Sequence, residues 1–144
     1  MIITVDTNVI YSALYSKSGA SNYILQLILQ EEIKLALSLQ TYLEYYDVLT
    51  REKNLKVLNL TVSEVEDTLD LLAALSQKHS IYFLLRPNLI DEKDNIFMEC
   101  AFASNSDYLI TSNVKDFKKG ELKGFRFKIV TPNEFYKQWR INHE

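Results

Sequence analysis

The 144-residue chain has one cysteine, Cys100, and two histidines, His79 and His143. A single cysteine excludes an internal disulfide and a cysteine-based zinc cluster, and it is typical of a reducing compartment. Two histidines so far apart disfavour a zinc site, and they also disfavour metal-free cleavage of RNA by a pair of imidazoles.

Glycine and proline are scarce as well, with three and two residues, whereas 47% of the chain is apolar or aromatic. This composition predicts one domain over residues 1–144. No stretch approaches the roughly 18–20 consecutive apolar residues that span a bilayer, so we expect no membrane association. The start has no basic segment and meets a carboxylate at Asp6, so we expect no signal peptide and a cytoplasmic location.

The chain also lacks an excess of positive charge, because 16 basic residues are offset by 19 acidic ones to give a net charge of -3. This excludes nucleic-acid binding by bulk charge alone. One segment differs: residues 115–128 contain six basic residues and two acids. It is either a solvated loop or a guide for a phosphate backbone. The candidate RNA-binding residues in it are Lys115, Lys118, Lys119 and Lys123.

Short apolar runs alternate with helical periodicity, which predicts an α/β fold with a mostly parallel five-stranded sheet covered on both faces. Strands are expected at residues 2–5, 34–37, 80–85, 107–111 and 125–130. Helices are expected at residues 9–15, 20–32, 39–53, from the capping box at 61–64 to about 78, from 91–94 onward, and at 133–141. Thr131 and Pro132 form the expected cap and first turn of the last helix.

Acidic residues follow four of the expected strands, where ligands bind in open parallel sheets. They are Asp6, Glu44, Asp94 and Asp116. Each one alone is commonly a helix cap, a turn residue or a solvated side chain. Four converging carboxylates, however, would repel one another and oppose folding. A bound divalent cation removes this difficulty, and carboxylate oxygens suit Mg²⁺ or Mn²⁺.

Five segments in order along the chain resemble the PIN domain family, the metal-dependent nuclease fold of VapC-like toxins in toxin–antitoxin pairs. They are residues 5–10 (VDTNVI), Glu44 with its neighbours (LEYY), 91–101 (DEKDNIFMECA), 108–117 (YLITSNVKDF) and 129–135 (IVTPNEF). The resemblance implies a three-layer α/β/α, Rossmann-like fold.

The resemblance also implies that Asp6, Glu44 and Asp94 are catalytic, metal-binding acids. Asp116 is the fourth acid in the version of the motif that has asparagine three residues earlier. Asp91 competes with Asp94, and we prefer Asp94 because its spacing to the following segments fits the family better.

Four polar residues are expected to support this site. Asn8 either hydrogen-bonds within the site or closes the turn after the first strand. Asn113 is a neutral neighbour of Asp116, and because other family members carry an acid there, one metal or two remain possible. Thr111 and Ser112 either contact a phosphate or act as local caps.

The implied activity is hydrolysis of RNA phosphodiester bonds by metal-activated water, which makes the chain an endoribonuclease toxin. The implied partners are an antitoxin protein and a second copy of the chain, and RNA binding is expected to depend on divalent metal. Two alternatives stand beside it. One is a catalytically silent PIN-like module that binds RNA or a protein. The other is a phosphatase-like enzyme with Asp6 as nucleophile, but Asn8 stands where its general acid belongs.

Overall fold

The computed structural model describes residues 1–78, 92–118 and 127–143, without the side chains of residues 78, 92–94 and 118. The strands are β1 (Ile2–Val5), β2 (Lys34–Leu37), β3 (Gln77–Lys78), β4 (Tyr108–Ile110) and β5 (Lys128–Val130). The helices are α1 (Thr7–Tyr15), α2 (Ala20–Leu29), α3 (Leu39–Leu49), α4 (Glu52–Leu58), α5 (Val62–Leu75), α6 (Glu92–Ser104), α7 (Val114–Lys118) and α8 (Pro132–His143). None of the helices described is both long and apolar enough to cross a bilayer.

The five strands form one parallel sheet in the order β3-β2-β1-β4-β5. The chain adds β2 and β3 on one side of β1 and then returns to add β4 and β5 on the other side. The strand order therefore reverses between β1 and β4, which is where ligands bind in sheets of this kind. The expected α/β fold with a parallel sheet is confirmed.

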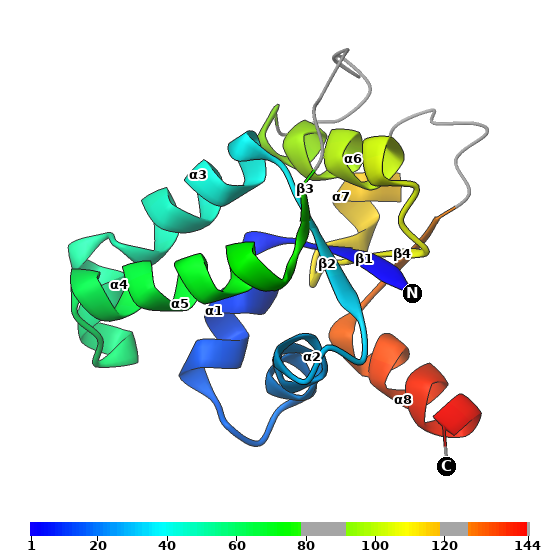
Figure 1. Ribbon diagram of the computed structural model, residues 1–144, viewed down its shortest axis with the longest axis horizontal. Coiled ribbons are helices and arrows are strands. Elements are labelled where there is room, and N and C mark those ends of the chain that lie inside the picture. Colours follow the sequence, from blue (N-terminus) through cyan, green and yellow to red (C-terminus); the bar gives the residue numbers. More distant parts are fainter. Residues whose placement is uncertain (79–91, 119–126, 144) are drawn as a thin grey trace.

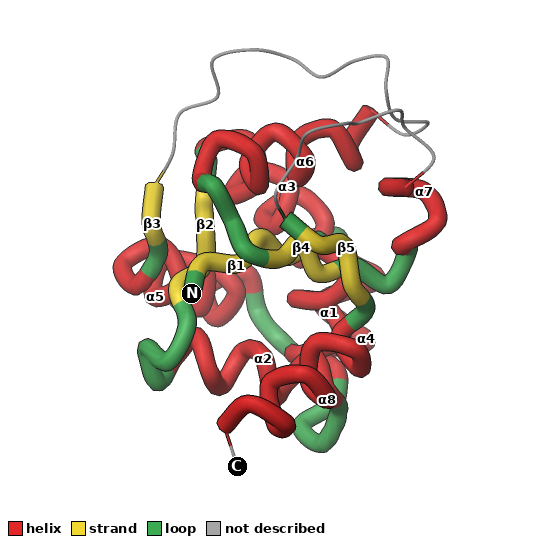
Figure 2. Tube along the Cα trace, turned by 90° about the vertical axis from the view of Figure 1, so that its right-hand side faces the viewer, coloured by secondary structure: helices red, strands yellow, loops and turns green. Residues whose placement is uncertain are grey.

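Helices cover both faces of the sheet. Helix α6 packs against β1, β2 and β4 on one face, while α2 and α8 pack together on the opposite side (Figures 1 and 2). The inner strands are buried beyond their first residues and mostly apolar, as Ile3 and Val5 of β1 show. Such strands need cover on both faces, which explains the three layers.

Two helices are capped by residues that directly follow a strand in the sequence. Asp6 has an extended backbone, and its carboxylate accepts a hydrogen bond from the Thr7 amide, so α1 starts two residues earlier than expected. Ser38 and Thr41 form a reciprocal capping box at the start of α3. At the last helix, Thr131 and Glu134 cap each other and Pro132 takes the first helical position, as expected.

The helix expected over residues 39–53 is wrong, because the chain forms two helices there. Helix α3 ends at Leu49, and α4 begins at Glu52 after a turn that contains Arg51. Polar side chains satisfy the last carbonyls of α3: the Thr50 hydroxyl donates to Tyr46 O at 2.7 Å, and Asn54 Nδ2 donates to Val48 O at 2.7 Å. These bonds allow the chain to change direction without leaving buried acceptors unpaired.

Other boundaries also differ from the expectation. Helix α5 ends at Leu75 rather than near residue 78, because Gln77 and Lys78 pair with β2 as the edge strand β3. Helix α2 ends at Leu29, before Glu31 takes a positive φ of 60°. Strand β4 is shorter than expected, and α7 was not expected. Residues 125–126 of the expected fifth strand and the whole strand expected at residues 80–85 lie outside the described residues.

Candidate active site

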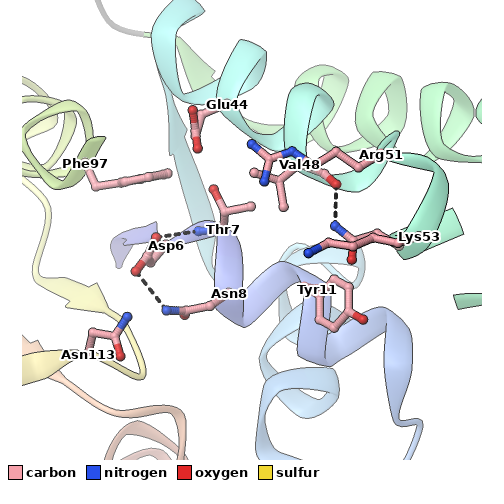
Figure 3. Close-up of a pocket in the computed structure, with 11 residues that line it drawn as sticks. Asp6, Thr7, Asn8, Tyr11, Glu44, Val48, Arg51, Lys53, Phe97 and Asn113 are labelled. Carbon is pink, nitrogen blue, oxygen red and sulfur yellow. Dashed lines mark hydrogen bonds between the residues drawn. The ribbon is translucent and has the colours of Figure 1, made fainter. Parts of the chain in front are cut away.

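A pocket of about 370 Å³ lies beside the carboxyl end of β1 (Figure 3). Its lining comes from the junction of β1 with α1, from α3 and α4 with the turn between them, from α6 and from the loop after β4. The lining residues are Asp6, Thr7, Asn8, Tyr11, Glu44, Val48, Arg51, Lys53, Asn54, Phe97 and Asn113. The pocket therefore brings together Asp6, Glu44, Asn8 and Asn113 from the set predicted for the site.

Asp6 is the most constrained of these residues, with only 7% of its surface exposed. One carboxylate oxygen accepts the Thr7 amide at 2.7 Å, and the other accepts Asn8 Nδ2 at 3.1 Å and the Thr111 hydroxyl at 2.7 Å. Hydrogen bonds to a carboxylate stabilise its ionised form. This network therefore holds a negative charge in one orientation at the end of β1.

The loop after β4 supports Asp6 across the point where the strand order reverses. Thr111 is fully buried, and its hydroxyl oxygen also accepts the Asn113 amide at 3.0 Å. The Ser112 amide donates to Asn8 Oδ1 at 3.3 Å, and the Asp6 amide donates to Ile110 O at 2.9 Å. The predicted supporting residues therefore lie next to Asp6 or next to each other.

Glu44 is half-buried and enters the pocket from α3. The neighbouring Tyr45 is buried, and its hydroxyl donates to Val5 O at 2.5 Å, immediately before Asp6. Burial raises the pKa of Tyr45 well above its usual value, so the phenol stays protonated and acts as a donor. This bond ties α3, and with it Glu44, to the end of β1.

Tyr42 and Tyr46, near Glu44 on α3, contact α5 and do not line the pocket. Tyr42 donates to Asp70 at 3.1 Å and Tyr46 donates to Glu66 at 3.3 Å, and both contacts join α3 to α5. Among the described residues, the tyrosine that lines the pocket is Tyr11 of α1.

The Thr7 hydroxyl has no hydrogen-bond partner within the described part of the chain, although its oxygen is buried. Thr7 lines the pocket, and Figure 3 draws its side chain between those of Asp6 and Glu44. A buried polar atom without a partner is rare in a folded protein and indicates that a polar ligand, water or ion belongs beside it. Two carboxylates and a hydroxyl form an all-oxygen donor set, which fits Mg²⁺ or Mn²⁺.

The other predicted acids are placed less directly. Asp94 lies in the first turn of α6, three residues before the pocket residue Phe97, but its side chain is outside the described set, as is Asp91 altogether. Asp116 lies in α7 and does not line the pocket, although its amide donates to Asn113 O at 3.0 Å. Among the side chains described, no three His, Cys, Asp or Glu residues cluster closely enough to hold a metal ion.

The predicted basic segment is only partly described. Lys115 of α7 is exposed and does not line the pocket, and the side chains of Lys118, Lys119 and Lys123 lie outside the described residues.

Sequence reasoning missed the basic residues that do line the pocket, Arg51 and Lys53. A signal for Arg51 was present, because Glu44, Val48 and Arg51 have the i, i+4, i+7 spacing of one helix face. All three line the pocket. The break between α3 and α4, which the sequence analysis did not anticipate, sets the position of Lys53.

Comparisons with known proteins agree with this architecture. The model of the family described as PIN domain matches residues 3–115. A chain in the crystal structure of VapBC2 from Rickettsia felis, bound to a DNA fragment from their promoter, superposes with a TM-score of 0.60 at 16% sequence identity. The alignment covers 91% of this chain and 98% of that one. No curated protein matched the sequence.

Proposed function

The chain belongs to the PIN domain family, and from this premise we propose that it is a metal-dependent endoribonuclease that acts as the toxin of a toxin–antitoxin pair. The observation that carries the proposal is the pairing of Asp6 and Glu44 in one pocket. Asp6 is buried and held by donors from α1 and from the loop after β4, while Glu44 arrives from α3. A buried and a half-buried acid that converge in a cleft favour a functional site over a purely structural one.

We assign Asp6, Glu44 and Asp94 to a Mg²⁺ or Mn²⁺ ion, with Asp116 as the fourth acid. When bound, the ion supplies the Lewis acidity that activates water and stabilises charge on the phosphate. The orphaned Thr7 hydroxyl supports this assignment, because it provides one more oxygen in the same pocket.

The residues around the acids hold them in position. Thr111 and Asn8 orient the Asp6 carboxylate, and Tyr45 keeps α3 against β1 so that Glu44 stays in the pocket. Partners of metal-binding carboxylates usually matter for affinity and activity. No protein nucleophile is required, because water attacks the phosphate.

We also propose that the chain acts in the cytoplasm and associates with a second copy and with an antitoxin protein. The superposed VapBC2 structure, which is bound to promoter DNA, supports an antitoxin partner. Exposed apolar residues on α3, Leu39 and Leu43, offer surface for an association of this kind.

The test uses purified protein and several labelled single-stranded RNAs. We expect cleavage with Mg²⁺ or Mn²⁺, loss of cleavage in EDTA, and a rate at least about 100-fold lower for Asp6→Asn, since even partners of metal ligands contribute 10–100-fold. Asp67→Asn is the matched control, because Asp67 is exposed on α5 outside the pocket.

Two outcomes would contradict the proposal. Metal-dependent cleavage that is unchanged in Asp6→Asn would place the reaction elsewhere. RNA binding without cleavage of any RNA would favour the alternative, a silent PIN-like module.

A further inference from the structure

The pocket has two sides of opposite charge. Asp6 and Glu44 lie on one side, while Arg51 in the turn after α3 and Lys53 in the first turn of α4 reach the same pocket (Figure 3). We call Arg51 and Lys53 the basic edge. The predicted basic segment after residue 114 is separate from it in the sequence.

Arg51 lies between α3 and α4 and has contacts with both helices. Its Nη2 donates to Asp47 Oδ2 at 2.9 Å, and its backbone oxygen accepts the amides of Asn54 and Leu55, both at 2.9 Å. The side chain stays 43% exposed. A guanidinium has five N–H donors, so the contact with Asp47 leaves donors for a second acceptor.

Lys53 differs from the neighbouring lysine of the same helix. Lys56 pairs with Glu52 at 3.3 Å and does not line the pocket. Lys53 lines the pocket and makes no ion pair within the described part of the chain. Its positive charge therefore remains available to a ligand.

An RNA strand is the substrate class that fits both sides. RNA carries one negative charge per nucleotide. The two carboxylates of the pocket therefore repel the parts of the strand that the metal ion does not neutralise. Cations beside the acids offset this repulsion and bind the backbone without reading sequence.

We propose that Arg51 and Lys53 bind the backbone phosphate next to the one that is cut, so that the basic edge aligns the RNA strand with the acids. This inference rests on the proposed ribonuclease function. It assigns substrate positioning to two residues that do not take part in the hydrolysis itself.

The test measures binding rather than turnover. A fluorescein-labelled single-stranded RNA is titrated with Asp6→Asn protein in Mg²⁺ at several KCl concentrations, so that no cleavage occurs. Arg51→Ala and Lys53→Ala are added singly and together, and Lys56→Ala is the matched control on the same helix.

The logarithm of the association constant falls with the logarithm of the salt concentration. In the double variant this negative slope is expected to be shallower by at least about 0.7, the value for one phosphate contact to a single strand. At about 0.15 M salt this corresponds to at least about fourfold weaker binding. The loss should be equal for oligo-U and oligo-A, because phosphates are common to both. Arg51→Lys should keep the slope, and thermal unfolding of each variant checks the fold.

Slopes and affinities of the folded double variant equal to those of Lys56→Ala would overturn the inference and would assign the basic edge to a protein partner. Cleavage by the wild-type chain is measured separately. RNA binding that depends on the basic edge without any cleavage would keep these residues as phosphate contacts, but it would reject the ribonuclease function and with it their placement beside a cut phosphate.

Discussion

The two sides of the pocket are built differently. At the carboxyl ends of β1 and β4, Asp6 and Thr111 are buried and joined by a hydrogen bond across 105 positions of sequence. On the α3–α4 side, Arg51 and Lys53 are exposed, and the Arg51 side chain has one ion pair, to Asp47 of α3. We call these the fixed side and the open side.

This difference separates two requirements of catalysis. A charge that holds a metal must be kept within a fraction of an ångström, which needs buried partners with fixed rotamers. A phosphate backbone is long and flexible, so it can be bound by solvated cations that adapt to it. Substitutions on the fixed side should therefore reduce activity or stability much more than substitutions on the open side.

Among the residues that support the acids, the largest effect is expected for Thr111→Val, which keeps the shape but removes the donor to Asp6 and the acceptor for the Asn113 amide. We expect metal affinity and cleavage rate to fall about 10–100-fold. Calorimetric titration with Mn²⁺ and single-turnover cleavage measure these quantities. Thr68→Val is the control, because that hydroxyl donates only to Glu64 O of its own helix. Equal effects of the two variants would contradict the claim that Thr111 positions Asp6 for metal binding.

A second prediction concerns the pH dependence of stability and the buried residue Cys100. Its thiol lies close to Thr4, Ser38 and Thr41. Burial raises the pKa of the Cys100 thiol from 9.0 to about 11, while hydrogen bonds with those residues lower it. The folded state therefore holds its proton more tightly than the unfolded state. This stabilisation is complete below about pH 9 and is lost as the pH rises through about 11.

Two pKa units correspond to about 3 kcal/mol. Urea unfolding at pH 8 to 11 should therefore show a steeper loss of stability for the wild type than for Cys100→Ala. Parallel curves for the two proteins would exclude a raised thiol pKa.

A smaller effect is expected for Tyr45→Phe, which removes the buried hydrogen bond to Val5 O. The free energy of unfolding should fall by about 1–3 kcal/mol, because the buried carbonyl loses a donor. Tyr46→Phe is the control, since its hydroxyl reaches Glu66 at the surface. Urea unfolding of both variants decides the matter, and equal losses would contradict the anchoring role of Tyr45.

The smallest effect is expected for Asp47→Asn on the open side. It removes the ion pair of Arg51, which is solvent-exposed and contributes less than about 0.5 kcal/mol. Thermal unfolding should hardly change. A loss as large as that of Tyr45→Phe would show that the open side is as rigid as the fixed side.

Much of the fold could be predicted from local patterns. The strand before Asp6, the capping boxes at Thr61 and Thr131 and the parallel sheet follow from residue types over a few positions. The break after α3 could not be predicted, because it depends on Asn54 reaching back to Val48 O. The strand pairing of Gln77 and Lys78 with β2 was not predicted, since it is a long-range contact.

The sequence by itself determined that Asp6 follows a buried strand and caps the next helix, because strand period and capping act over a few residues. The sequence also contains few cysteines and histidines, so the side chains that remain to bind a metal are mainly oxygen donors. Only the tertiary structure decided which side chains meet. Thr111 reaches Asp6 because β4 pairs beside β1, and Glu44 shares the pocket because Tyr45 ties α3 to the end of β1. These contacts depend on the packing of distant segments, which no local pattern contains.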